Sequence, residues 1–164
     1  MSHPLKTHYY HSPLGWIELK SENEALCSLI FIDEDVKNEE DQADVFFQAC
    51  IDQLSAYFNG TLQNFDIPMS YSGTSFQIQI WNELKNVAYG ETASYEELSK
   101  RVNNPKAIRA VANANAQNKF HLLVPCHRII GKNGSLTGYA GGIWRKQWLL
   151  DHEAKISSKR LSLF

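Results

Sequence analysis

The pattern of apolar residues changes partway along the chain, and this change is the strongest constraint on its fold. Three short strand-like segments occupy the first 35 residues, namely Thr7–His11, Trp16–Lys20 and Leu26–Ile32. The first two flank Ser12–Gly15, whose Ser, Pro and Gly residues favour a tight turn. We therefore predict a three-stranded antiparallel meander at the start of the chain.

Helical periodicity follows an acidic connection at Asp33–Glu40. Apolar residues recur at three- and four-residue steps from about Asp41 to Phe58, which predicts a helix that Gly60 ends. The stretch Thr61–Gly73 contains Pro, Ser and Gly residues and is interpreted as the link between two domains, residues 1–72 and 73–164. Strands followed by helices predict an α+β protein.

The second domain is predicted to be mainly helical. Apolar spacing and capping residues predict helices over residues 75–87, 94–102, 106–115 and 143–153. Ser94 is the expected N-cap of the second of these, because Glu97 follows it as in a capping box. Asn103–Pro105 separates the second helix from the third, so this pair is expected to form a helix-turn-helix.

The two domains differ strongly in charge, although the net charge of the chain is only −2. Residues 1–72 hold three Lys and Arg against 12 Asp and Glu, which gives −9; residues 73–164 hold 13 basic and six acidic groups, which gives +7. A basic half points to a polyanionic partner. The alternative is uneven surface decoration without a function.

Composition favours a water-soluble intracellular protein. Apolar residues make up 43% and charged residues 21% of the chain, as is usual for globular domains. The longest nearly apolar run, Ala25–Ile32, is far shorter than the about 20 residues that a membrane-spanning helix needs. Three cysteines do not suggest a disulfide framework. We expect a cytoplasmic protein with no membrane contact.

The helix predicted at residues 106–115 carries unusually short side chains. Five alanines lie in or just after it, with Arg109 among them: Ala107, Ala110, Ala112, Ala114 and Ala116. Such a helix can lie close to another surface because little projects from it. The alternative is a helix packed tightly into the protein core.

The most reactive group of residues is Val124–Gly131, in which Cys126 is followed by His127 and Arg128. A free thiol titrates near pH ~8.5, so nearby cations or a base would raise its reactive fraction. His127 could act as that base, directly or through one water. Adjacent residues on a strand point in opposite directions, so the backbone must turn at Pro125. The alternative is an inert buried cysteine, which suits Cys27 and Cys50.

Residues 125–130, Pro-Cys-His-Arg-Ile-Ile, resemble the acceptor motif of the O6-alkylguanine-DNA alkyltransferases. Further segments resemble the same family, in its order and spacing: residues 94–98, 104–111, Asn118, 137–142 and 146–153. Tyr9–Gly15 resembles the opening strand of the family's first domain. The resemblance covers about Phe76 to Glu153 and implies a ribonuclease H-like first domain and a winged-helix-like second domain.

The resemblance implies direct reversal of DNA damage. The alkylated base is extruded from the duplex, and the Cys126 thiolate takes the alkyl group, usually methyl, from guanine O6 and possibly from thymine O4. The reaction is irreversible, each molecule acts once, and no cofactor or metal is needed. The expected partner is double-stranded DNA containing O6-alkylguanine, bound through the minor groove by a monomer.

The resemblance also assigns the reacting groups. Glu153 and His127 match a relay that reaches Cys126 through a water, as in a catalytic triad. Asn118 matches a residue that braces the turn around the cysteine. Tyr95 matches a tyrosine that protonates guanine N3. Structural roles, such as helix capping by Asn118 or core packing by Tyr95, are the alternatives.

Other positions match groups that contact DNA or the base. Arg109 fills the gap left by the extruded base, and the remaining predicted DNA contacts are Lys106, Ala107, Ala110 and Arg128. The base pocket is lined by Tyr139 and Ala140, of which Ala140 offers only its backbone N–H. Backbone carbonyls of Cys126 and Ile129 read the guanine amino group.

The chain departs from the family pattern at two positions. Lys119 and His121 stand where many relatives have proline, so the wall of the loop is expected to be less rigid and more basic. Two other functions compete with alkyl transfer. One is a sensor of damaged DNA, although such relatives lack the acceptor that Cys126 supplies; the other is a hydrolase that uses Cys126, His127 and Glu153.

Overall fold

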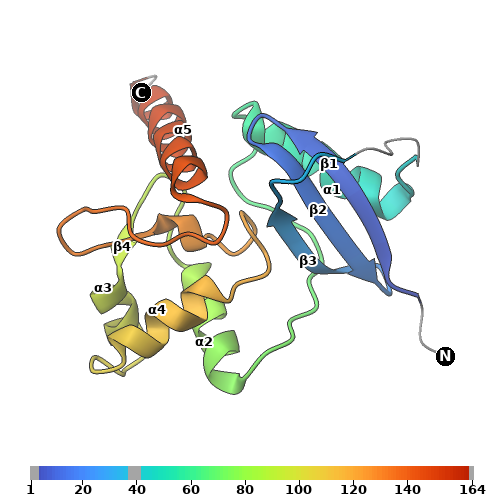
Figure 1. Cartoon of the computed structure of the whole chain (residues 1–164). Helices are drawn as coiled ribbons and strands as arrows, with labels where there is room; N and C mark the ends of the chain where they lie inside the picture. Colours follow the sequence, from blue (N-terminus) through green and yellow to red (C-terminus); the bar gives the residue numbers. More distant parts are fainter. Residues whose placement is uncertain (1–3, 37–41, 163–164) are drawn as a thin grey trace. The chain divides into compact units, whose positions relative to one another are not determined.

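The computed structural model describes residues 4–36 and 42–162 and divides into two compact units, Met1–Ser72 and Gly73–Phe164 (Figure 1). Residues 37–40 of the predicted acidic connection lie outside the described part. Each unit has its own buried core. Among the helices of residues 4–36 and 42–162, none is long and apolar enough to cross a lipid bilayer.

The first unit contains the predicted antiparallel meander. Its strands are β1 (Lys6–Ser12), β2 (Gly15–Glu22) and β3 (Ala25–Phe31), in that spatial order. Strand β1 is one residue longer than predicted at each end, β2 is one residue longer at its start and two at its end, and β3 begins and ends one residue earlier. Ser12 closes the first turn, since its hydroxyl donates to the Gly15 carbonyl at 2.7 Å and accepts from the Leu14 N–H at 3.1 Å. The α+β expectation is confirmed.

One helix, α1 (Val45–Phe58), completes this unit. It begins later than the predicted Asp41 because Asp44 is the N-cap, whose carboxylate accepts from the Phe47 N–H at 2.8 Å. It ends as predicted before Gly60, which takes a φ of +87° that favours glycine. The buried face of the helix consists of Phe47, Cys50, Leu54, Tyr57 and Phe58.

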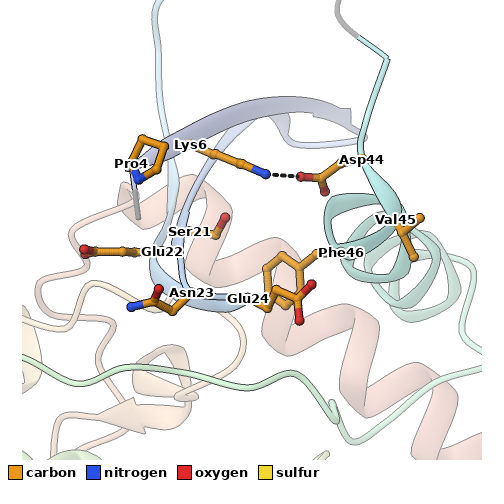
Figure 2. Close-up of a pocket in the computed structure, with 9 residues that line it drawn as sticks. All are labelled: Pro4, Lys6, Ser21, Glu22, Asn23, Glu24, Asp44, Val45 and Phe46. Carbon is orange, nitrogen blue, oxygen red and sulfur yellow. Dashed lines mark hydrogen bonds and ion pairs between the residues drawn. The ribbon is translucent and has the colours of Figure 1, made fainter. Parts of the chain in front are cut away.

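A surface hollow lies between the start of β1, the β2–β3 turn and the N-terminus of α1 (Figure 2). It has a volume of about 510 Å³. The Lys6 ammonium group reaches across it to the Asp44 carboxylate at 3.3 Å, and the neighbouring Val45 is 90% exposed. This exposed ion pair joins strand and helix but contributes little to stability.

The second unit is mainly helical, as predicted. Its elements are α2 (Ser75–Leu84), β4 (Ala93–Ser94), α3 (Tyr95–Arg101), α4 (Ile108–Ala116), a 3₁₀ turn at Cys126–Arg128, β5 (Ile129–Ile130) and α5 (Ile143–Ser162). The predicted helix-turn-helix is α3 and α4 (Figure 1). Ser94 caps α3 as expected, because its hydroxyl accepts from the Glu97 N–H at 3.0 Å.

Several boundaries in this unit differ from the prediction. Helix α2 ends three residues before Val87, which is nevertheless buried. Helix α4 begins two residues after Lys106, because a turn occupies the segment before it. Helix α5 runs to Ser162 rather than to about Glu153. The parallel pairing of β4 with β5 was not predicted, since two-residue strands carry no periodicity.

A buried core positions the helices of this unit. Its buried apolar members include Ile80, Trp81, Leu84, Leu98, Val111, Val124 and Leu149. The Trp81 indole N–H donates to the Ala114 carbonyl at 2.9 Å and so fixes α4 against α2. This contact satisfies a buried polar group and sets which face of α4 points outward.

Candidate active site

The backbone reverses direction immediately before Cys126. Leu122 has a φ of +73°, a left-handed conformation that is unusual for a branched side chain. The Val124 N–H bonds back to the Phe120 carbonyl at 3.0 Å, and a 3₁₀ turn begins at Cys126. Cys126 and His127 therefore do not point to opposite faces of a strand, and the turn expected at Pro125 is present.

Asn118 braces this reversal with its whole side-chain amide. The amide nitrogen donates to the Val124 carbonyl at 2.9 Å, to the Phe120 carbonyl at 3.3 Å and to the Cys126 sulfur at 3.1 Å. The amide oxygen accepts from the Phe120 N–H at 2.9 Å. One buried side chain thus connects the end of α4 to both the loop backbone and the thiol.

His127 and Glu153 form a buried pair beside the thiol. Imidazole Nε2 lies 2.8 Å from the Glu153 carboxylate, and the two side chains are 0% and 1% exposed. Imidazole Nδ1 is also buried and has no hydrogen-bond partner among the residues that the structure describes. The ring therefore keeps one nitrogen for proton transfer while Glu153 fixes its orientation.

The prediction that Arg128 contacts DNA is wrong, because its side chain is buried inside the protein. The side chain is only 7% exposed. Its Nε and Nη2 donate to the two oxygens of Glu153 at 2.8 and 3.0 Å, and Nη1 donates to the Val87 carbonyl at 2.8 Å. A guanidinium with these partners belongs to the protein interior, so Arg128 supports the His127–Glu153 pair instead.

A cavity of about 440 Å³ opens onto the thiol. Its lining residues come from α3, α4 and the loop before α5: Tyr95, Ala112, Asn115, Ala116, Cys126, Thr137, Gly138, Tyr139 and Ala140. The predicted pocket residues Tyr95, Tyr139 and Ala140 thus meet around Cys126. Ile129 does not line the cavity; it is fully buried, and its carbonyl accepts from the Lys146 ammonium group.

The two tyrosines differ in their hydrogen bonding. The Tyr95 hydroxyl donates to the Thr137 carbonyl at 3.1 Å, and burial raises the pKa of this phenol. The Tyr139 hydroxyl is buried and finds no partner within residues 4–36 and 42–162, and burial raises its pKa well above the usual value. Both phenols remain protonated donors at neutral pH.

Burial dominates the charge state of the reacting groups. It raises the pKa of the Cys126 thiol to about 11, although Asn118 and Lys146 act in the opposite direction. Burial also lowers the pKa of His127 below its usual value, more strongly than Glu153 raises it. The resting site thus holds a thiol and a neutral imidazole, although the sequence had suggested that nearby groups would ionise the cysteine.

The outer face of α4 carries the other predicted contacts. Lys106, Arg109 and Ala110 are exposed, and Ala107 is half-buried. Val111 and Ala114 point into the core. The alanine-rich helix is thus packed into the core on one face only, and its other face is exposed to solvent with Ile108, Arg109 and Ala110 on it.

Three buried residues near the site were missed from the sequence. Lys146 is 0% exposed, and its ammonium group donates to the carbonyls of Ile129, Thr137 and Gly138. Arg145 donates to the Gly141 carbonyl at 2.9 Å, and the buried amide oxygen of Asn115 has no hydrogen-bond partner within residues 4–36 and 42–162. Lys, Arg and Asn are usually surface residues, so residue type alone gave no sign that these three are buried.

The expected effect of the two loop substitutions holds for one of them. Lys119 is exposed. His121 is buried against the Tyr139 ring, with 5.5 Å between centroids, and burial lowers its pKa to about 4. At neutral pH it is uncharged, so it does not make the loop more basic.

Known proteins share both the sequence and the structure of this chain. Residues 75–155 match the family description "6-O-methylguanine DNA methyltransferase, DNA binding domain", and residues 5–71 match its ribonuclease-like domain. A methylated-DNA–protein-cysteine methyltransferase of Methanosarcina acetivorans is 44% identical over 153 residues, which are 88% of this chain and 95% of that protein.

Two crystal structures from Mycobacterium tuberculosis extend the comparison. The O6-methylguanine methyltransferase matches with a TM-score of 0.83 and 37% identity, over 93% of this chain and 94% of that chain. The OGT protein in complex with DNA matches with a TM-score of 0.82 and 40% identity, over 92% and 93% of the two chains. With both of its units matched, the chain belongs to the methylated-DNA–protein-cysteine methyltransferase family.

Proposed function

We propose that this protein repairs DNA by moving an alkyl group, usually methyl, from guanine O6 to the sulfur of Cys126. The observation that carries the proposal is the cavity of about 440 Å³ that Cys126 lines together with Tyr95 and Tyr139. It offers an extruded base both a nucleophile and phenol donors. Extrusion from the duplex costs about a few kcal/mol.

In the transfer step the sulfur–carbon bond forms as the carbon–O6 bond breaks. Cys126 starts as a thiol, so its proton passes to Nδ1 of His127, directly or through one water. Glu153 stabilises the imidazolium that results. The guanine leaves as a neutral base once Tyr95 protonates N3, for which its hydroxyl turns away from the Thr137 carbonyl. The Tyr95 phenolate then regains a proton as the His127 imidazolium loses one, so the proton of the thiol ends on guanine and both side chains are neutral again. The thioether is not hydrolysed, so each molecule reacts once.

The remaining predicted groups position the base. Tyr139 and the Ala140 N–H close over it from the loop before α5. The Cys126 carbonyl reads the guanine amino group. The Ile129 carbonyl already accepts a hydrogen bond from the Lys146 ammonium group. A carbonyl has two lone pairs, so it can still accept a second hydrogen bond from the guanine amino group.

DNA binding is assigned to the second unit. Its +7 charge and the exposed Arg109 on α4 favour a duplex partner, with α4 in the minor groove and Arg109 in the gap left by the base. The short side chains of α4 permit the close approach that a narrow groove requires. We propose that one copy of the chain acts alone and in the cytoplasm, with residues 1–72 as a supporting domain.

The intact mass of the protein tests this function. Incubation with duplex DNA containing O6-methylguanine should add one methyl group, on the peptide that holds Cys126. Cys126→Ala should gain no methyl group and still bind DNA. Demethylated product in excess of protein would instead indicate a hydrolase. Methylation of Cys27 or Cys50, or of none, would refute the assignment.

A further inference from the structure

The Glu153 carboxylate is shared between two buried cations or potential cations. Arg128 donates to both of its oxygens, at 2.8 and 3.0 Å, while His127 contacts one of them at 2.8 Å. The Gly90 N–H adds a longer contact of 3.4 Å to the first oxygen. The bidentate partner is therefore Arg128, and the histidine is the additional one.

Charge balance follows from this arrangement. A buried carboxylate that faced only a histidine would favour the imidazolium form, with the proton taken up from solvent, because an isolated buried charge is strongly unfavourable. Arg128 carries a permanent positive charge and already neutralises Glu153. A proton added to His127 would then place a second positive charge beside the same anion.

We infer that Arg128 is a positioning residue that neutralises Glu153, so that His127 rests uncharged and Cys126 remains a thiol until a base occupies the cavity. This inference rests on the proposed function, because it concerns the same sulfur. A thiol reacts slowly with oxidants and electrophiles other than the substrate. Keeping Cys126 as a thiol would therefore protect a protein that can react only once. The proton then moves to His127 only during transfer.

The other charged and titratable groups around His127 do not change this conclusion. Lys146 of α5 adds a further positive charge that disfavours the imidazolium, and Glu153 on the same helix favours it. From the loop, His121 is uncharged at neutral pH. Cys126 becomes negative only when it reacts. Arg128 is thus the bidentate cation whose removal takes a permanent positive charge away from Glu153 while the contact with His127 stays.

The test compares Arg128→Gln, which removes the charge, with Arg128→Lys, which keeps it. Arg101→Gln is the control, because Arg101 is an exposed arginine of α3. Two readouts are needed across a pH series, and neither uses alkylated DNA. One is the NMR titration of the His127 ring. The other is the rate at which iodoacetamide alkylates Cys126, with iodide as the leaving group, followed on the Cys126 peptide.

In the unaltered protein His127 should titrate below its usual value, and alkylation of Cys126 should level off at low pH with a slow plateau. Arg128→Gln should raise the His127 titration by about one unit or more. The plateau of the alkylation rate should rise by the same factor, about tenfold, because the thiolate–imidazolium population depends on the difference between the two pKa values. Arg128→Lys keeps the positive charge but not the bidentate geometry, so its His127 titration and plateau should lie closer to those of the unaltered protein than to those of Arg128→Gln. Arg101→Gln should stay within about twofold of the unaltered protein.

Two results would overturn the inference. One is an Arg128→Gln protein whose His127 titration and plateau are unchanged; the other is an Arg128→Lys protein that behaves like Arg128→Gln, which would make shape rather than charge decisive. If Arg128→Gln does not fold, the NMR titration of His127 in the unaltered protein still tests the inference, because an imidazolium at His127 at neutral pH would contradict it. If the His127 titrations and the alkylation rates are as expected but no methyl group is transferred from DNA, this result would count against the proposed function and not against the role of Arg128.

Discussion

Desolvation outweighs every favourable contact at the acceptor cysteine. The Asn118 amide and the Lys146 ammonium group both favour a thiolate, yet burial holds the pKa of Cys126 at about 11. In the proposed mechanism the nucleophile therefore forms together with the imidazolium, as a pair with no net charge. Such a pair is far easier to create in a buried site than an isolated thiolate.

The same burial makes stability depend on pH through His121. Its pKa is about 4 in the folded protein, against 6.5 for the free side chain. Between these values the unfolded chain binds the proton more strongly, so stability is complete above pH ~6.5 and falls as the pH drops. His127, whose pKa is also lowered by burial, acts in the same direction.

Replacing His121 with phenylalanine should flatten this dependence. From about pH 7.5 to about pH 5 the unaltered protein should lose roughly 2 kcal/mol more than His121→Phe. Urea unfolding at each pH measures the difference. His11→Phe, at an exposed position of β1, should keep the full slope. Equal slopes in all three proteins would show that His121 is not held neutral by the fold.

The positions of some side chains could be predicted from the sequence, whereas those of others could not. His127 and Glu153 were predicted as a pair from the family motif, and the structure places His127 Nε2 2.8 Å from the Glu153 carboxylate. Arg128 was misplaced because a basic residue beside a DNA-binding site resembles a phosphate contact. Only the fold shows that Glu153, 25 residues away along the chain, accepts from the Nε and Nη2 of Arg128, while the Val87 carbonyl accepts from its Nη1.

Helix α4 has two faces with different tasks. Val111 and Ala114 are buried, while Arg109 and Ala110 are exposed. The α2 residue Trp81 fixes the helix through the Ala114 carbonyl, so its rotation is set by the core. Arg109 is then the one long, charged side chain on this nine-residue helix, as expected of a group that enters the base stack.

Arg109→Ala should therefore separate base extrusion from chemistry. Alanine favours the helix, so folding should be unaffected. Repair of O6-methylguanine in duplex DNA should slow by about 10- to 100-fold, because the unstacking energy of about 2 kcal/mol is no longer offset. Reaction with the free base O6-benzylguanine should change by less than about twofold. Equal losses on both substrates would remove the extrusion role from Arg109.

The elements themselves were predictable where their periodicity is long. The meander and the helices that begin at Ser75 and Ile143 follow from residue patterns of several turns or alternations. The pairing of β4 with β5 joins residues 93–94 to 129–130, and nothing in either dipeptide indicates the partner. The end of α2 was placed too late because Val87 is apolar and buried although it lies beyond the helix.

Charge is divided between the two units of the molecule rather than mixed. The first unit carries −9 and the second +7. A polyanion is attracted by one unit and repelled by the other, so it binds in one orientation. Binding of this kind releases counterions from DNA, and the affinity falls linearly with salt on a logarithmic scale.

Lys106 is expected to contact phosphate in that complex, since it is exposed directly before α4. Removing one phosphate contact should reduce the salt slope by about one, whatever the DNA sequence. The measurement uses the Cys126→Ala protein on undamaged duplex DNA, with and without Lys106→Ala, over a salt series. Lys20→Ala, in β2 of the acidic unit, is the control and should leave the slope unchanged. If Lys20→Ala changed the salt slope and Lys106→Ala did not, the DNA would bind the first unit rather than the second. The assignment of α4 to the minor groove would then be wrong.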